Sequence, residues 1–239
     1  MDKNDPFATT IPAPTAARPL LGLTVLVIED SRFACEAMRL LCLRSGARIR
    51  RADSIRSAHR HLRVYRPSVA VVDIGLPDGT GEDLIRELTT IEPRVEVVLG
   101  TSGDPDGEER AMAAGADGFL DKPISSLAVF QQTVLGNLPA DRQPAGLREM
   151  TDETIAPDQM AFQDDMAHIA DMLQAPMDDG TLDYAAQFLS GVARSARDDT
   201  LESAAVALAK ARAKGAPARS ETAALAGLVH DRLSRKMAI

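Results

Sequence analysis

The stretch Leu23-Thr24-Val25-Leu26-Val27-Ile28-Glu29-Asp30 decides the fold. A nearly pure apolar run of this length is typical of a strand buried on both faces of a sheet, and here two carboxylates follow it directly. The segment Ser68-Val-Ala-Val-Val-Asp73 is again an apolar run that ends in a carboxylate, and residues 95–99 form a third apolar run. Strands that are buried on both faces predict a parallel sheet covered by helices.

Helical patterns alternate with these runs. Ser54 and Ser125 are candidate N-caps of two of the helices. The arginines of the weak strand at residues 47–52 indicate an edge position. Five βα units predict an α/β fold, a five-stranded doubly wound parallel sheet with right-handed crossovers. The helical patterns cover residues 32–44, 54–65, 81–91, 106–114 and 125–138, and the remaining weak strand covers residues 117–121.

Polar groups stand at the carboxyl ends of four strands. The acid pair Glu29-Asp30 follows the first strand, Asp73 ends the third, and Thr101 and Lys122 follow the fourth and fifth. In a doubly wound sheet these ends share one edge, where ligands bind. Clustered carboxylates suit a divalent cation, and a lysine and a hydroxyl suit phosphoryl oxygens. The pattern predicts Mg²⁺-dependent transfer of phosphate onto an aspartate. Taken singly, each residue also fits a helix start, a turn, a cap or a surface charge, so the prediction depends on their convergence.

The chain divides into four parts. Residues 1–20, rich in Ala and Pro, predict a disordered tail, and residues 21–138 hold the α/β domain. Residues 139–157 contain several prolines and predict a linker. Residues 158–239 have only helical patterns, at 158–174, 181–197, 200–214 and 220–236, and predict a small helical bundle. Asp199 with Glu202 resembles a capping box at the third of these helices.

Composition limits the function further. The 239 residues carry a net charge of -8, which weighs against nucleic-acid binding by the whole chain but leaves a local basic face open. Cys35 and Cys42, seven residues apart on one helix, lie too far apart to form a disulfide. Without a long apolar segment, we expect no membrane span and a cytoplasmic protein.

Residues 23–138 resemble the receiver domain of response regulators in bacterial two-component systems. The resemblance covers about half of the chain. It implies a flavodoxin-like receiver fold and a phosphoprotein with no separate enzymatic domain. The matching segments are Glu29-Asp30-Ser31, Asp73-Ile-Gly-Leu-Pro77 with Gly81, Thr101-Ser102 and Phe119-Leu-Asp-Lys122-Pro123.

The resemblance also implies a metal site and a phosphoryl donor. Asp73 would accept a phosphoryl group from the phosphohistidine of a sensor histidine kinase or a histidine phosphotransferase. Glu29, Asp30, Asp73 and the carbonyl of Gly75 would hold Mg²⁺.

By the same resemblance, Lys122 and Thr101 would contact the phosphoryl oxygens, and the Lys122-Pro123 peptide would be cis. Phe119 would be an aromatic switch that turns inward when Thr101 moves, with a plain core role as the alternative. The segment between Thr101 and Lys122 is one residue shorter than is common in the family, which predicts a short or mobile fourth helix.

Three interpretations compete for residues 158–239. Residues 141–239 hold 11 Lys and Arg against 16 Asp and Glu, which favours a protein-interaction or dimerisation module with a protein partner. The alternative is a DNA-binding helix-turn-helix over the last two helices, with a basic cluster near the turn. A third is a catalytic domain, for instance a phosphotransferase that uses His230 or a phosphatase. The basic cluster consists of Lys210, Arg212, Lys214 and Arg219.

Overall fold

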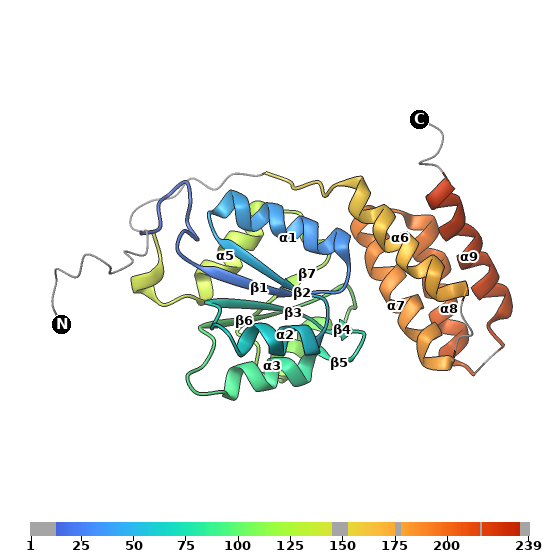
Figure 1. Ribbon diagram of the computed structural model, residues 1–239, viewed down its shortest axis with the longest axis horizontal. Helices are drawn as coiled ribbons and strands as arrows, with labels where there is room; N and C mark the ends of the chain where they lie inside the picture. Colours follow the sequence, from blue (N-terminus) through green and yellow to red (C-terminus); the bar gives the residue numbers. More distant parts are fainter. Residues whose placement is uncertain (1–12, 145–152, 175–177, 216, 235–239) are drawn as a thin grey trace.

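The computed structural model describes residues 13–144, 153–174, 178–215 and 217–234. An α/β domain carries a bundle of helices at one end of its sheet (Figure 1). Among the described residues, no helix is both long enough and apolar enough to cross a membrane.

Five parallel strands form the sheet, in the order β2-β1-β3-β6-β7. This topology confirms the doubly wound fold, and it places the arginine-bearing β2 at an edge, as predicted. A two-stranded hairpin of β4 (Gly75–Leu76) and β5 (Gly79–Thr80) follows β3 and was not anticipated from the sequence. The strands of the main sheet are β1 (Thr24–Ile28), β2 (Arg48–Ala52), β3 (Val69–Asp73), β6 (Val97–Ser102) and β7 (Gly118–Asp121).

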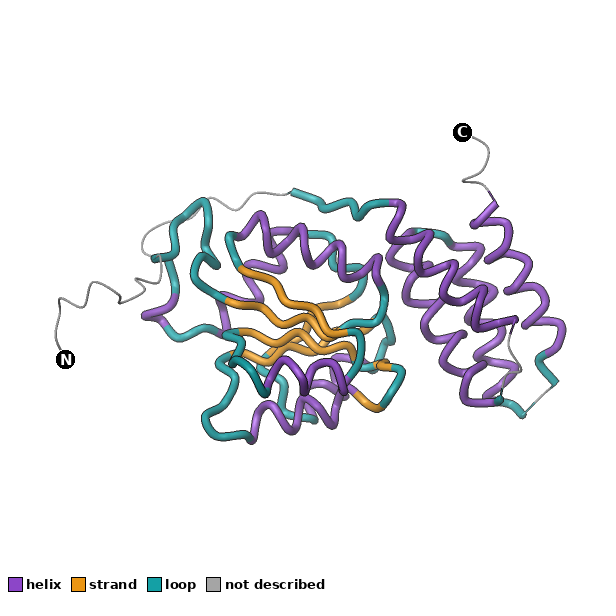
Figure 2. The backbone as a smooth tube through the Cα atoms, viewed as in Figure 1, coloured by secondary structure: helices purple, strands orange, loops and turns teal. Residues whose placement is uncertain are grey.

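Helices cover both faces of the sheet (Figure 2). One face carries α1 (Arg32–Ser45) and α5 (Leu127–Asn137), and the other carries α2 (Ile55–Leu62), α3 (Gly81–Thr90) and α4 (Gly107–Ala113). Alternate residues of β1 point to opposite faces, so Val25 and Val27 join one core cluster while Leu26 and Ile28 join the other. With seven residues, α4 is short, as the sequence predicted.

Three of the helix caps test the sequence directly. Ser54 caps α2 as predicted, by accepting a hydrogen bond from the Ser57 amide. The predicted caps of two other helices are wrong by one residue. Ser126, not Ser125, caps α5, and Asp198, not Asp199, caps the helix that begins at Asp199. Adjacent residues of one type compete for a cap, and the backbone conformation selects between them.

Segments outside the predicted domain boundaries also pack on the sheet. Leu20 is fully buried in the α1-side core, one residue before the predicted start of the domain. Within the predicted linker, Ile155 is buried in the same core, and its amide donates to the Ser125 carbonyl at 2.7 Å. The structure does not describe residues 1–12, which hold most of the predicted tail, or residues 145–152 of the predicted linker.

The C-terminal part forms a helical bundle, as predicted. Its apolar residues form a core of their own, which includes Leu189, Leu201 and Leu225. Phe33 of α1 joins this core, and its ring lies edge-on to Phe162 at a centroid distance of 5.8 Å. The bundle therefore packs directly on the α/β domain. Its helices are α6 (Gln159–Gln174), α7 (Asp179–Ala196), α8 (Asp199–Ala213) and α9 (Arg219–Ser234).

Candidate functional site

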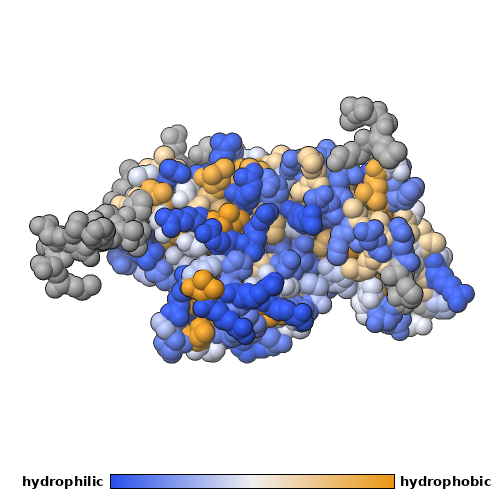
Figure 3. Space-filling model, viewed as in Figure 1, coloured by the Kyte–Doolittle hydropathy of each residue, from blue (hydrophilic) through white to orange (hydrophobic). Residues whose placement is uncertain are grey.

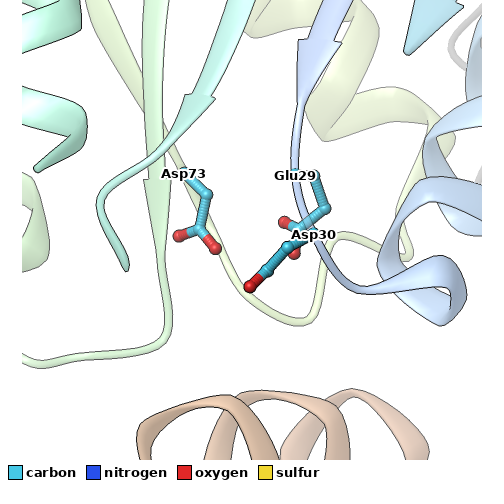
Figure 4. Close-up of side chains that lie close together, drawn as sticks. All are labelled: Glu29, Asp30 and Asp73. Carbon is cyan, nitrogen blue, oxygen red and sulfur yellow. The ribbon is translucent and has the colours of Figure 1, made fainter. Parts of the chain in front are cut away.

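Three carboxylates converge where β1 and β3 end. Glu29 and Asp30 follow β1 directly, and Asp73 is the last residue of the neighbouring strand β3. Each offers an oxygen within 4.8 Å of the others, and Figure 4 shows the side chains together, with a helix of the bundle below them. Glu29 and Asp73 are buried. Buried carboxylate oxygens at this spacing fit a hard divalent cation such as Mg²⁺.

A buried lysine joins the cluster from the end of β7. The Lys122 Nζ lies 2.8 Å from the Asp73 Oδ2 and 2.6 Å from the Glu29 Oε2. Burial alone would lower the pKa of Lys122, but the two carboxylates outweigh burial and hold the pKa above its usual range. Burial, followed by the charge of Asp73, holds the pKa of Glu29 well above its usual value. One ammonium therefore only partly neutralises three carboxylates, which leaves the site suited to further positive charge.

The third carboxylate is held by the bundle. The Tyr184 hydroxyl of α7 donates a hydrogen bond to the Asp30 Oδ2 at 2.6 Å. Burial raises the pKa of Asp30 to about 6, although this hydrogen bond opposes the rise. Burial and the charge of Asp30 raise the pKa of Tyr184 in turn, so the phenol keeps its proton and acts as the donor.

The predicted phosphoryl-contacting threonine lies beside Asp73 but is turned to another partner. Thr101 lies within β6, not after it, and pairs in register with Asp73. Its hydroxyl donates to the Leu120 carbonyl at 2.7 Å. The neighbouring Phe119 is half-buried against the core on the α2–α4 side. The peptide between Lys122 and Pro123 is cis, as the resemblance implied.

Gly75 lies at the rim of the site. Its amide donates to the Asp73 Oδ1 at 3.3 Å. The Gln187 side chain of α7 covers it so closely that a Cβ at position 75 would collide with the side-chain amide. The bundle therefore contacts the site at Gly75 as well as at Asp30.

A further contact between the domains holds the first turn of α1. Asp165 of α6 is 2% exposed, and its carboxylate accepts hydrogen bonds from the Ser31 hydroxyl at 2.7 Å, the Arg32 amide at 2.8 Å and the Phe33 amide at 3.1 Å. The amides at a helix N-terminus lack partners within their own helix, and the helix dipole favours an anion there. Asp165 thus caps α1 from a different domain.

Sequence reasoning missed Asp165, Tyr184 and Gln187. Each occupies an ordinary position on an amphipathic helix, and its partner lies more than a hundred residues away in the chain. No local pattern marks such a contact.

The bundle leaves little room above Asp73, although a larger cavity of about 910 Å³ opens beside Glu29 and Asp30. The cavity between Asp73 and α7 measures about 40 Å³, which holds roughly three water molecules. Its lining includes Asp73 and Lys122 from the α/β domain and Tyr184, Gln187 and Arg194 from α7.

The candidate residues of the other interpretations lie elsewhere. Arg212, from the predicted basic cluster, forms ion pairs with Asp179 and Asp183 of α7 at 2.7 and 2.8 Å. His230 is exposed on α9, which lies on the side of the bundle away from the sheet (Figure 1). The structure therefore does not bring His230 to Asp73.

Known proteins resemble the α/β domain. The family model of the response regulator receiver domain matches residues 25–133. The KDP operon transcriptional regulatory protein KdpE of Escherichia coli is 28% identical over 133 residues, which cover 55% of this chain and 59% of that protein. The probable transcriptional regulatory protein TcrX of Mycobacterium tuberculosis is 34% identical over 104 residues, which cover 43% and 44%. The chain thus spans about half the length of the curated relatives it matches.

Solved structures also match this part of the chain. The signal receiver domain of a signal transduction histidine kinase from Syntrophus aciditrophicus is 25% identical, with a TM-score of 0.44, over 56% of this chain and 98% of that one. The signal receiver domain of a DNA-binding response regulator from Colwellia psychrerythraea is 23% identical, with a TM-score of 0.42, over 47% and 94%. Residues 25–133 thus match the response regulator receiver domain family, and the match ends before the helical bundle.

Proposed function

We propose that the protein is a cytoplasmic two-component response regulator that accepts a phosphoryl group on Asp73 and signals through the bundle of α6–α9. The phosphoryl donor is the phosphohistidine of a sensor histidine kinase or a histidine phosphotransferase. The observation that carries the proposal is the buried cluster of Glu29, Asp30, Asp73 and Lys122 within a receiver domain.

The side chains of the cluster suit this reaction. An Asp73 oxygen attacks the phosphorus, the phosphorus–nitrogen bond of the donor breaks, and the imidazole leaves and takes up a proton. Glu29, Asp30, Asp73 and the Gly75 carbonyl would hold Mg²⁺, which neutralises charge on the transferring group when bound.

Two further groups then change partners. Lys122 exchanges its contact with Glu29 for a phosphoryl oxygen. Thr101 turns its hydroxyl from the Leu120 carbonyl to another phosphoryl oxygen, and Phe119 fills the space that Thr101 leaves. The protein's own chemistry is confined to gaining and losing the phosphoryl group.

The bundle supplies the response because α7 occupies the space above Asp73 that the phosphoryl donor would need. A cavity of about 40 Å³ accommodates about three waters but not a phosphohistidine side chain. Transfer to Asp73 therefore requires α7 to move away from the pocket. A phosphoryl group on Asp73 and a docked α7 then exclude each other, and by linkage each weakens the other to the same degree.

The docked arrangement is therefore the resting state, and the undocked bundle is the signalling state. Release exposes the faces of α6 and α7 that carry Asp165, Tyr184 and Gln187 to a protein partner or a second copy of the chain. The ion pairs of Arg212 with Asp179 and Asp183 occupy part of the cluster on which the DNA-binding alternative depends, so we favour the protein-interaction module.

The test uses the intact chain and Asp73→Ala, each with Mg²⁺ and acetyl phosphate. Native mass spectrometry follows phosphorylation and oligomeric state, and amide hydrogen exchange follows Arg32 and Phe33, which Asp165 protects. We expect one added phosphoryl group in the intact chain only, together with faster exchange at both amides. No added phosphoryl group would refute the assignment of Asp73. Phosphorylation with unchanged exchange would refute the coupling to the bundle and leave Asp73 as the acceptor.

A further inference from the structure

Residues 48–66 carry a concentration of arginines without carboxylate partners. The segment holds seven arginines and one carboxylate, Asp53, in a chain whose net charge is -8. All seven arginines are exposed, and within the described parts of the chain none of them forms an ion pair. Other described arginines do form such pairs, namely Arg32, Arg39, Arg44, Arg86, Arg94, Arg110, Arg142, Arg194, Arg212 and Arg232. Among the described residues Arg18, Arg197 and Arg219 also form no ion pair, so what distinguishes residues 48–66 is the concentration of seven such arginines in one segment.

Three of these arginines line one hollow beside α2 and form the surface that we call the arginine face: Arg56, Arg60 and Arg63, on and just after α2. Ile49 packs on the α1 side of the sheet, so Arg48 and Arg50, which alternate with it, point to the α2 side. Deep blue residues cover this region in Figure 3, where Figure 1 shows α2 and β2.

The arrangement on α2 opposes the stability of the helix. Arg56, Arg60 and Arg63 are spaced four and three residues apart, so they share one side of the helix and repel each other. The nearby carboxylates are engaged elsewhere. The two Asp78 oxygens accept hydrogen bonds from the Ile55 and Arg56 amides at 2.8 and 3.0 Å.

Glu87 lies 2.9 Å from the His59 Nε2, and the Asp53 Oδ1 accepts a hydrogen bond from the Ser54 hydroxyl at 2.9 Å. A hollow of about 360 Å³ remains beside α2. Its lining consists of Arg56, Arg60 and Arg63 together with Ile55, His59 and Asp78. Arginines on the edge strand β2 also discourage strand pairing between copies of the chain. Arg56, Arg60 and Arg63 lie on and just after a helix, so protection against strand pairing does not explain them.

We propose that the arginine face binds the phosphate backbone of duplex nucleic acid, a function beyond phosphoryl acceptance at Asp73. The planar guanidinium group matches phosphate oxygens in a two-pronged contact. The eight residues of α2 extend over about 12 Å, which faces roughly three to four phosphates of one strand. Single-stranded binding would need aromatic platforms for the bases. Tyr65, next to the face, is half-buried and its hydroxyl lies 3.1 Å from the His61 Nδ1.

The experiment measures binding of the full chain to a fluorescent duplex of about 20 base pairs by anisotropy, at several salt concentrations from about 50 to 200 mM. One triple variant carries Arg56→Gln, Arg60→Gln and Arg63→Gln. The control carries Arg86→Gln, Arg94→Gln and Arg142→Gln, which make the same change in net charge at arginines that have carboxylate partners.

We expect the slope of log affinity against log salt to flatten by about 2 to 3 in the first triple variant, since each phosphate contact contributes about 0.9. The control should keep the slope of the unmodified chain. Asp73→Ala should also keep it, so failure of this proposal is distinguishable from failure of the phosphorylation mechanism.

Three results would overturn the proposal. One is the absence of any anisotropy change at the lowest salt. Another is an equal loss of binding in both triple variants, which would show a general effect of net charge. The third is displacement of the duplex by polyglutamate at an equal concentration of charges, which would indicate an acidic protein surface as the partner.

Discussion

Replacing Tyr184 by phenylalanine removes one hydroxyl from the boundary between α7 and the acidic pocket. The hydroxyl donates to the Asp30 Oδ2 at 2.6 Å, and its ring packs against Phe188 at a centroid distance of 5.8 Å. Phenylalanine keeps the ring and its packing. The variant therefore tests the hydrogen bond and leaves the fold of the bundle intact.

The size of the effect follows from the chemistry of the bond. A hydrogen bond to a charged group contributes about 1.5 to 3 kcal/mol. Tyr184 is only partly buried, so the lower end applies, about 1.5 kcal/mol, or roughly tenfold in the docking equilibrium. If Asp73 reacts only in the undocked state, and that state is rare, the rate of phosphorylation rises by the same factor of about ten.

The assay is the initial rate of phosphorylation by acetyl phosphate at saturating Mg²⁺, followed by intact mass. The chain has one other tyrosine, Tyr65, which lies after α2 and contacts His61. Tyr65→Phe is thus a matched control that removes the same atom far from the pocket, and we expect it to react at the rate of the unmodified chain. Amide exchange at Arg32 and Phe33 reports undocking without reference to phosphorylation.

The reasoning would be refuted if Tyr184→Phe reacted at the unmodified rate while exchange at Arg32 and Phe33 increased. The bundle would then undock without opening the site. Unchanged exchange together with an unchanged rate would show that the Tyr184 hydroxyl contributes nothing to docking.

Four further changes test other parts of the structure. Asp165→Asn should weaken docking by about 1 to 3 kcal/mol, because a neutral amide is a poorer acceptor for the α1 amides, and exchange at Arg32 and Phe33 measures it. Lys122→Ala leaves Glu29 and Asp73 buried without a cation and should lower the free energy of unfolding by about 3 to 5 kcal/mol, with partial recovery in Mg²⁺, as thermal melts with and without the ion would show. The pKa of Asp30 is raised from 3.8 to about 6, so its protonated form should compete with Mg²⁺ below that pH. The affinity for Mg²⁺, measured by calorimetry, should fall by up to about tenfold for each pH unit below about 6 and should be constant above that pH. In the absence of the ion, the folded state binds the Asp30 proton more tightly than the unfolded state, so this group should lower stability as the pH rises from 3.8 to about 6. Leu189→Ala in the bundle core should cost about 2 to 5 kcal/mol, measurable as an earlier loss of helical circular dichroism, and an unchanged transition would show that the bundle is not packed around this residue.

Much of the site was predictable because its residues are tied to strand ends. Once the buried runs before Glu29 and Asp73 are identified as neighbouring parallel strands, chain geometry alone brings the two carboxylates to one edge. The hydrophobic period likewise predicted the helices of the bundle to within a few residues. Cap positions were less certain, because Ser125 and Ser126, like Asp198 and Asp199, offer the same side chain at consecutive positions.

The sequence by itself determined the edge position of β2, the acidic cluster and the existence of a separate helical bundle, because each depends on short-range periodicity and on residue type within the strands or at their ends. Only the tertiary structure decided that the bundle closes the pocket. The hydrogen bond of Tyr184 to Asp30 and the cap of Asp165 on α1 join residues more than 130 positions apart. Such contacts depend on how the surfaces of two folded domains complement each other, and no local sequence pattern in either segment predicts that complementarity.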